Sequence, residues 1–343
     1  MKKGDSMSNY ELKVGVIGVG AIGKEHIKRI NNRTKGARVV GVYDILEEET
    51  KELAAEWGLH FYNSGEELIA SDDVNAILIT SVDETHAEYV LKAIEHDKYV
   101  FCEKPLAIDS DSCYEIIKAE AAKGRKLVQV GFMRRYDKGY MELKNMIDSH
   151  SYGDVLMLHC AHRNPESGEN YITPMSIIQT AVHEIDVLRW LLQDDYVSVE
   201  SILPKKQTKM THKDLHDPQI LVLETKSGVI IQLEIFVNCQ FGYDIKCEVV
   251  CENGEIGLVD PHYTYAKQNL AHQTPISPDW QSRFREAYDT EFQLWVNGVL
   301  NGKLEGPSSW DGYVASVITT AGTESTKRGG KIKVSLSEKP SIY

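Results

Sequence analysis

The sequence lacks long hydrophobic runs, basic blocks and clustered cysteines. No apolar segment in the 343 residues approaches the roughly 18 residues of a membrane span, so we expect no membrane insertion. Asp and Glu (51) outnumber Lys and Arg (38), the net charge is -13, and no cationic stretch typical of a nucleic-acid surface occurs. We therefore expect neither a membrane nor a nucleic acid among the partners.

Scattered cysteines and histidines give no metal or disulfide pattern. Of six cysteines, only Cys247 and Cys251 are close together, and their strand-like surroundings are typical of neither a zinc site nor a redox pair. Four histidines, His159, His162, His212 and His216, show no zinc-type arrangement with cysteine or carboxylate. The N-terminal stretch MKKGDSMSNYELK has no apolar core of a signal peptide. We expect no metal, reduced thiols and a cytoplasmic protein.

The chain length favours two domains. Residues 1–130 alternate short apolar strands with amphipathic helices, which predicts a doubly wound, mostly parallel sheet. The expected strands lie at 13–20, 37–44, 76–81, 99–105 and 126–132, and the expected helices lie at 21–32, 46–58, 84–97 and 109–124.

Residues 131–343 have a different pattern. Hairpin-like strands with turn signals are expected at 196–204, 219–228, 229–238, 243–254 and 255–260. Helices are expected at 283–298 and 311–328, and a loop at 262–280. This pattern predicts a second, α+β domain with a large open, mostly antiparallel sheet.

A glycine motif closes the first expected strand and opens the helix after it. VIGVGAIG places Gly18, Gly20 and Gly23 as G-x-G-x-x-G, a weak signal alone. Asp44 ends the next strand, where a dinucleotide site places the acidic residue that binds ribose hydroxyls. A carboxylate there repels a 2′-phosphate and no arginine follows it, so the sequence favours NAD over NADP.

Two other stretches carry polar groups in unusual places. SIIQTAVHEIDVLRWLL has helical apolar spacing, yet Gln179, His183 and Asp186 follow one stripe of that helix. The stripe is either a set of satisfied core residues or the wall of a site. Lys104, in FCEKPLA, follows a strand at the ligand-binding edge of the parallel sheet, although a rigid exposed turn has the same pattern.

The motifs GVGAIGKEH, EKPLA, GFMRRYD and HEIDVLRWLL, in this order, resemble the glucose-fructose oxidoreductase, inositol dehydrogenase and MocA-like (Gfo/Idh/MocA) family, and within it the bacterial inositol dehydrogenases. The resemblance covers nearly the whole chain. It implies an N-terminal Rossmann domain, a C-terminal domain whose open sheet packs in a homotetramer, and a small polyol substrate. It also implies oxidation of a ring carbinol of inositol to the inosose ketone, with the hydride passing to NAD.

The resemblance assigns roles to single residues. Lys104 is expected to contact the reacting hydroxyl and His183 to take its proton, which suits an imidazole near neutral pH and a cation beside a developing alkoxide. The polyol site is expected to include Lys104, Arg134, Asn164, Gln179, Thr180, His183 and Tyr243. The cofactor site is expected to include Gly18, Gly20, Ala21, Ile22, Gly23, Asp44, Ser81, His86, Glu103 and Lys104.

Gln179 departs from the family pattern. Most inositol dehydrogenases of this type have aspartate four residues before the base histidine, where its charge can stabilise the protonated imidazole. Glutamine carries no charge, and its amide both donates and accepts. We treat Gln179 as part of the catalytic group, and it weakly favours scyllo-inositol over myo-inositol as the substrate.

Several alternatives stay open. In the first alternative the substrate is myo-inositol, and in the second it is a related cyclic sugar. In the third, the protein is a non-enzymatic NAD sensor on the same fold. Tyr243 is a packing residue in the simplest interpretation of its strand, and Asp186 is favoured as a structural hydrogen-bond partner. His26 is expected to pack near the cofactor loop.

Overall fold

The computed structural model describes residues 11–262 and 264–343. It forms two compact units. Unit 1 contains the described residues up to Gly131 together with Asp289–Gly312 and Lys339–Tyr343, and unit 2 contains Phe132–Tyr288 and Tyr313–Glu338. Residues 1–10 of the N-terminal stretch lie outside the described residues, and so does Tyr263 of the predicted loop.

The two units differ from the predicted domains in two segments near the C-terminal end of the chain. The prediction put all of residues 131–343 in the second domain. Residues 289–312 and 339–343 pack with unit 1. Phe292, Trp295 and Val296, from helix α8 (Trp280–Leu300), are buried in the core of that unit beside β1 and α1. Burial of these large apolar side chains holds the second half of α8 there.

Unit 1 contains a six-stranded parallel sheet in the order β3-β2-β1-β4-β5-β6. Its strands are β1 (Leu12–Ile17), β2 (Ala37–Tyr43), β3 (His60–Phe61), β4 (Ala76–Ile79), β5 (Tyr99–Cys102) and β6 (Val128–Val130). Its helices are α1 (Ala21–Arg33), α2 (Glu47–Trp57), α3 (Gly65–Ala70), the short 3-10 helix η1 (Asp83–Thr85), α4 (His86–Glu95) and α5 (Ser110–Lys123). The predicted doubly wound Rossmann sheet is confirmed, and the two-residue strand β3 and the short helix α3 were not predicted.

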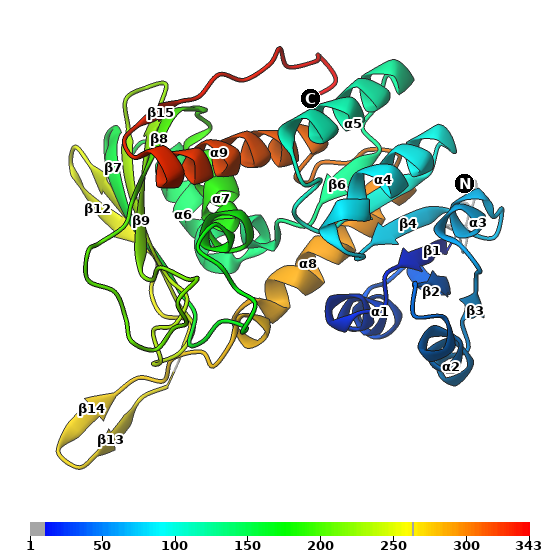
Figure 1. Cartoon of the computed structure of the whole chain (residues 1–343), viewed down its shortest axis with the longest axis horizontal. Coiled ribbons are helices and arrows are strands. Elements are labelled where there is room, and N and C mark those ends of the chain that lie inside the picture. Colours follow the sequence, from blue (N-terminus) through cyan, green and yellow to red (C-terminus); the bar gives the residue numbers. More distant parts are fainter. Residues whose placement is uncertain (1–10, 263) are drawn as a thin grey trace, which may run out of the picture. The chain divides into compact units, whose positions relative to one another are not determined.

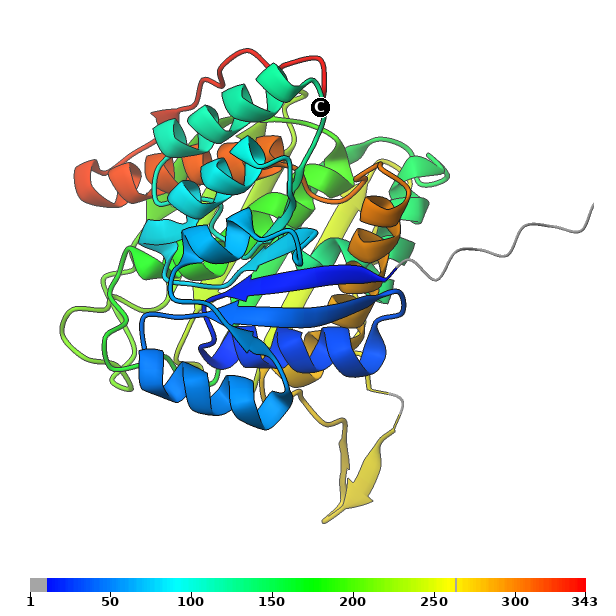
Figure 2. The same ribbon diagram turned by 90° about the vertical axis from the view of Figure 1, so that its right-hand side faces the viewer.

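Strands of unit 1 are apolar on both faces because helices cover both. All four residues of β4 are buried. α1 and α2 lie on one side of β1 and β2, and α4 and α5 lie on the other (Figure 2). α5 has local end signals: the Asp109 side chain accepts from the backbone N–H of Ser112, and the helix ends at Gly124 with φ of 70°.

Unit 2 contains a seven-stranded sheet in the order β12-β11-β7-β10-β9-β8-β15. Its strands are β7 (Val155–Arg163), β8 (Tyr196–Ile202), β9 (Gln219–Thr225), β10 (Ile230–Phe236), β11 (Asp244–Cys251), β12 (Gly254–Gly257) and β15 (Ile332–Lys333). β7 and β10 pair in parallel, and the other pairs are antiparallel. The predicted open, mostly antiparallel sheet is confirmed.

Helices of unit 2 include α6 (Lys138–Asp148), α7 (Val182–Leu192), most of α9 (Ser309–Arg328), the 3-10 helix η2 (Met133–Tyr136) and the π-helical turn η3 (Ser176–Ala181). The prediction did not include α6, although Asp137 caps it by accepting from the backbone N–H of Tyr140. It also placed a loop where β13 (Ala266–Gln268) and β14 (Ala271–Gln273) form a hairpin that projects from the unit (Figure 1). The turn residues Asn269 and Leu270 have positive φ, and leucine is no sequence signal for such a turn.

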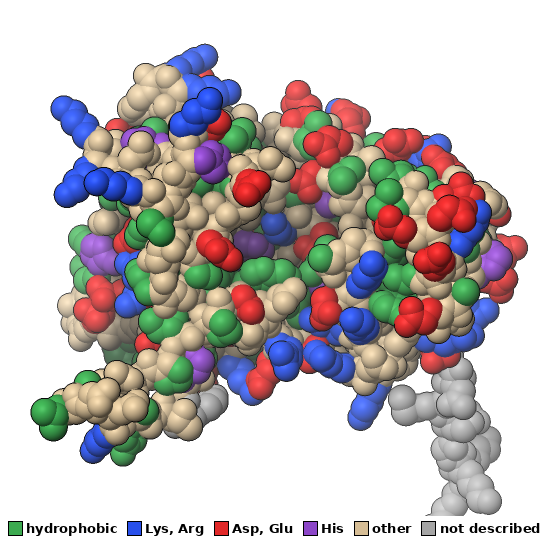
Figure 3. Space-filling model, turned by 60° about the horizontal axis from the view of Figure 1, so that its bottom comes forward, with side chains coloured by type: hydrophobic (Ala, Val, Ile, Leu, Met, Phe, Trp, Pro, Cys, Tyr) green, Lys and Arg blue, Asp and Glu red, His purple; other side chains and the backbone are tan. Residues whose placement is uncertain are grey.

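The surface is charged, and acidic groups outnumber basic ones. Figure 3 shows Asp and Glu side chains interspersed with Lys and Arg on the visible face, in line with the net charge of -13. Across the part of the chain that the structure describes, the helices are too short or too polar to cross a membrane.

Candidate active site

The glycine loop after β1 has three glycines with different surroundings. Gly18 has φ of +95°, and a Cβ there would lie 2.4 Å from the backbone nitrogen of Ser81. A Cβ on Gly23 would lie 2.2 Å from the carbonyl oxygen of Gly18. A Cβ on Gly20 would meet nothing within 4 Å. Gly18 and Gly23 are therefore required by packing, whereas the space beside Gly20 is open to a ligand.

Asp44 follows β2 and binds the glycine loop directly. Its Oδ2 accepts from the backbone N–H of Val19 at 2.7 Å, and its Oδ1 accepts from that of Leu46 at 3.1 Å. Each carboxylate oxygen keeps a second lone pair for another donor. Glu47, Glu48 and Glu49 occupy the first turn of α2, the helix that follows Asp44.

The loop after β4 is tied to the loop after β5 by a buried histidine. His86 Nε2 lies 3.1 Å from the carbonyl oxygen of Ser81, and His86 Nδ1 lies 2.7 Å from that of Pro105. The Ser81 and Thr85 hydroxyls are 2.7 Å apart. His86 is 1% exposed, so its ring is buried between these two loops, and its contacts there are with their backbone carbonyls.

Glu103 and Lys104 follow β5. The Glu103 side chain points into unit 1: Oε1 lies 2.7 Å from His26 Nε2, and Oε2 accepts from the backbone N–H of Lys104 at 3.2 Å. His26 also packs against the ring of Phe292, with centroids 4.6 Å apart. The Glu103 carboxylate therefore supports the Lys104 turn from inside the unit.

His183 lies in the first turn of α7, directly after a π-helical turn. In η3 the backbone N–H of Val182 donates to the carbonyl of Ile177, an i→i+5 bond. The predicted Gln179–His183 stripe assumed α-helical spacing, which begins only at Val182. Gln179 lies within η3 and is partly exposed, as is His183. Isolated π-turns are rare and occur often at functional sites.

Thr180 forms a hydrogen bond with a residue that was not predicted. Tyr171 Oη lies 2.8 Å from the carbonyl oxygen of Met175 and 2.5 Å from Thr180 Oγ1. A carbonyl only accepts, so the Tyr171 hydroxyl donates to Met175 and the Thr180 hydroxyl donates to Tyr171. Thr180 Oγ1 can then only accept from a further hydroxyl group.

Arg134 lies in a buried polar cluster of unit 2. Its NH1 donates to Glu184 Oε1, and its NH2 donates to Tyr243 Oη at 3.2 Å. His162 Nδ1 lies 2.8 Å from Glu184 Oε2 and 3.2 Å from Arg134 NH2. The guanidinium carbon also lies 5.1 Å from the centre of the Phe284 ring. Arg134 and Tyr243, two of the predicted polyol ligands, are thus brought together by the structure.

The cluster is closed to solvent. Arg134 is 1% exposed and Tyr243 4% exposed. Burial raises the pKa of the Tyr243 hydroxyl, which is therefore neutral. Direct contact of either residue with a polyol stays a prediction, because the guanidinium already has acceptors within the protein.

Two further residues have defined surroundings in unit 2. Asn164 is partly exposed and follows β7, where its backbone N–H donates to Phe236 and its carbonyl accepts from Cys239. Asp186 receives two hydrogen bonds from Arg135, with Nε to Oδ2 at 2.8 Å and NH2 to Oδ1 at 2.5 Å. The structural role favoured for Asp186 agrees with this bidentate pair.

Both units match models of one protein family. Residues 12–132 match the GFO_IDH_MocA oxidoreductase family, NAD-binding Rossmann fold. Residues 144–334 match the C-terminal alpha/beta domain of the same family. The chain belongs to the Gfo/Idh/MocA oxidoreductase family.

Curated relatives of this oxidoreductase are similar over their whole length. The inositol 2-dehydrogenases of Burkholderia ambifaria and Klebsiella pneumoniae are each 50% identical over 334 residues, 97% of this chain and 99% of theirs. A solved structure of myo-inositol dehydrogenase from Lactobacillus casei, with NAD(H) and myo-inositol, is 38% identical with a TM-score of 0.94, covering 97% of this chain and 99% of its own. The L. casei scyllo-inositol dehydrogenase, 21% identical with a TM-score of 0.88 over 94% of this chain and 99% of its own, shows the fold alone.

NAD is the cofactor of this oxidoreductase, and the residues of unit 1 fit it. The open space beside Gly20 adjoins the N-terminus of α1, whose first turn has neither a side-chain cap nor an acidic residue. Ala21 and Ile22 lie in this turn, whose N–H groups suit a pyrophosphate. Asp44 has the position and the remaining lone pairs to accept ribose hydroxyls.

Sequence reasoning missed Tyr171, His162 and Glu184 as parts of the polar clusters. The sequence does contain an indication for Glu184, because a carboxylate on the buried side of an amphipathic helix needs a partner. It contains none for His162 and Tyr171, since each meets its partners only through the tertiary fold. The catalytic, cofactor and substrate roles assigned above remain predictions.

Proposed function

We propose that this oxidoreductase catalyses the NAD-dependent oxidation of a ring carbinol of inositol to the inosose ketone. The observation that carries the proposal is the 50% identity, over 97% of the chain, with enzymes named inositol 2-dehydrogenase. The chain also contains Lys104 and His183, the residues to which the family resemblance assigns the chemistry.

Each residue has a distinct task in this proposal. Bound NAD accepts the hydride from the carbinol carbon. His183 takes the hydroxyl proton, since a carbinol releases hydride readily only as that proton leaves. Lys104 places a positive charge at the same oxygen and stabilises the developing alkoxide. Asn164, Gln179 and Thr180 bind the other ring hydroxyls, and Thr180 does so only as an acceptor.

Two isomers have separate support. The preference for scyllo-inositol rests on Gln179, whose neutral amide replaces a carboxylate. Myo-inositol is the alternative, supported by the 38% identical L. casei enzyme whose structure contains that isomer. The ratio of kcat/KM for the two isomers with NAD decides between them, and a clear preference for myo-inositol removes the first.

The test is a substrate panel with the purified protein, following NADH absorbance. We expect turnover of an inositol with NAD and much slower turnover with NADP. Turnover of another cyclic sugar or of an aldose, without turnover of either inositol, would contradict inositol as the substrate class and assign that sugar instead. NAD binding without turnover of any polyol would favour the NAD-sensing alternative.

The proposal includes a homotetramer in the cytoplasm. The tetramer rests on the family resemblance, and the location rests on the sequence composition. Light scattering of the purified protein tests the first, and a dimeric or monomeric mass at micromolar concentration would contradict it.

A further inference from the structure

A chain of polar side chains inside unit 1 leads from α8 to the residue before Lys104. Arg29 Nε donates to Asp289 Oδ1 at 2.9 Å. Arg29 NH1 lies 2.5 Å from His26 Nδ1, and His26 Nε2 lies 2.7 Å from Glu103 Oε1. His26 is fully buried, and the Arg29 side chain is 7% exposed. Asp289, whose side chain is 30% exposed, ends this chain at the surface. Continuous contacts of this kind fix the buried groups that they join.

The partners of His26 define its tautomer. A guanidinium has only donors, so His26 Nδ1 accepts from Arg29. His26 Nε2 therefore carries the proton and donates to Glu103. Burial lowers the pKa of His26, and the charge of Arg29 lowers it further, against the opposing effects of Glu103 and Glu25. The ring is neutral and has one orientation.

Glu103 is consequently held as an anion. Burial alone raises the pKa of its carboxyl, but the hydrogen bond from His26 and the charge of Lys104 together leave that pKa below its usual value. Oε2 accepts from the backbone N–H of Lys104. A Cβ on Gly131 would lie 3.0 Å from the carboxyl group, so the carboxylate is also enclosed on that side.

We propose that His26, Arg29 and Asp289 are positioning residues, which hold Glu103 ionised beside Lys104 and thereby keep the Lys104 ammonium protonated. The proposal rests on the proposed function, in which Lys104 contacts the reacting hydroxyl. A protonated lysine stabilises an alkoxide, whereas a neutral lysine does not. A buried carboxylate that loses its donor takes up a proton more readily, and the negative charge on the residue next to Lys104 is then lost.

The first experiment needs no substrate. Competitive acetylation of the full-length protein with acetic anhydride across a pH series, read by peptide mass spectrometry, reports the titration of Lys104. In His26→Leu we expect Lys104 to be acetylated at least about threefold faster at pH 7 than in the wild type, because more of it is neutral. With inositol and NAD, the alkaline limb of kcat should move to lower pH while KM for NAD stays within about twofold.

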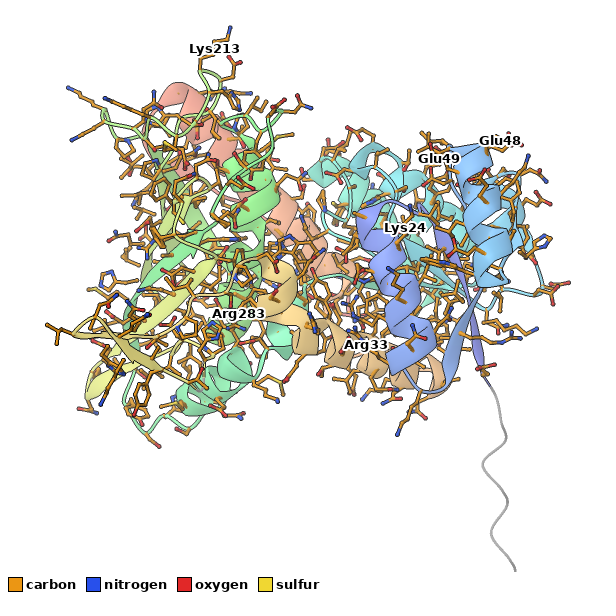
Figure 4. The ribbon with its side chains drawn as sticks, turned by 90° about the horizontal axis from the view of Figure 1, so that it is seen from below. Lys24, Arg33, Glu48, Glu49, Lys213 and Arg283 are labelled. Carbon is orange, nitrogen blue, oxygen red and sulfur yellow. The ribbon has the colours of Figure 1, made fainter. Side chains whose placement is uncertain are left out.

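Two variants give matched comparisons. His26→Gln keeps an amide that both donates and accepts, and we expect it to restore most of the wild-type profile. Arg33 lies at the C-terminal end of α1 (Figure 4), and its exposed side chain donates from NH1 to Asp289 Oδ1 at 3.3 Å. Arg33→Gln removes this contact without changing His26 or Arg29. It should leave the titration of Lys104 unchanged.

Glu103→Gln keeps the test decisive if His26→Leu does not fold. It preserves the shape and an acceptor for His26 but removes the charge, so Lys104 should again be acetylated faster. An unchanged Lys104 profile in this variant would overturn the proposal, even in an active enzyme. If the profile shifts but the wild type oxidises no inositol, the effect on Lys104 stands and the proposed substrate fails.

Discussion

Arg134 and Glu184 form an ion pair in which each side chain is only 1% exposed. Arg134 lies in η2, and Glu184 lies in α7 directly after His183. His162 contacts the second oxygen of the same carboxylate at 2.8 Å. A fully desolvated charge pair therefore joins α7, the helix that carries the proposed base, to η2.

Glu184→Gln should destabilise the protein. The substitution leaves the Arg134 guanidinium buried without a counter-charge, and breaking such pairs costs about 3–5 kcal/mol. Urea denaturation followed by circular dichroism measures the loss in the free energy of unfolding. Glu324→Gln is the matched control, because it breaks an exposed i,i+4 pair with Arg328 and should cost at most about 0.5 kcal/mol. Equal losses in the two variants would contradict the assigned burial.

Asp44→Ser should weaken NAD and admit NADP. It removes the charge that repels a 2′-phosphate and the acceptor that holds Val19 in the glycine loop. We expect the ratio of kcat/KM for NAD over NADP to fall at least about tenfold, or about 1.4 kcal/mol. Glu48→Gln, on the outer side of α2 and 85% exposed at its side chain, is the control (Figure 4). An unchanged NAD affinity in Asp44→Ser would exclude Asp44 as a ribose ligand.

Lys104→Ala and His183→Ala should each lower kcat by about 100-fold or more, since both act on the reacting hydroxyl. NAD affinity, measured by fluorescence titration, should remain within about threefold of the wild-type value in both variants, because the glycine loop and Asp44 still bind the pyrophosphate and the ribose, and Lys104, although expected in the cofactor site, acts mainly on the reacting hydroxyl. A variant that lost NAD binding but kept kcat at saturating NAD would refute its assigned role.

Gln179→Asp should change the pH profile of the reaction. A carboxylate near His183 stabilises the protonated imidazole, so the acidic limb of kcat/KM should move to higher pH. The same substitution should shift the ratio of activities with scyllo- and myo-inositol. If the profile and the isomer ratio both stay at wild-type values, Gln179 is not part of the site.

His26 should make stability depend on pH. Burial lowers its pKa below the ordinary value of 6.5, so the folded protein keeps it neutral while the unfolded chain takes up a proton below that pH. The unfolded state then binds more protons, and the free energy of unfolding falls as the pH drops from 6.5 towards 5, by up to about 1.4 kcal/mol per pH unit. His26→Gln should remove this slope, and His60→Gln, at an exposed site, should keep it. A slope that survives in His26→Gln would show that His26 is not buried as a neutral ring.

Prediction from the sequence succeeded where the signal is local. Most strands and helices of unit 1 have their own periodicity, with β3 and α3 as the exceptions, and the glycine motif lies at a defined strand end. β7 was missed because its position is set by pairing with β10 and β11, which lie far along the chain. Arg134 was assigned to the polyol without its partner Glu184, which is 50 residues away. Such pairings depend on the tertiary fold, and no local pattern contains them.

The π-helical turn before His183 also bears on how this site can vary. A π-turn contains one residue more than an α-turn, so Ser176–Ala181 is equivalent to a one-residue insertion in a longer helix. Deleting one residue there would allow continuous α-helix; the side chains before the turn would nearly keep their direction relative to α7, and those within the turn would rotate about the axis. Gln179 would then face a different direction, while His183 and Glu184 would keep theirs. Given the proposed contact of Gln179 with the polyol, the substrate range can therefore change through the length of one short segment, without any substitution at the proposed base.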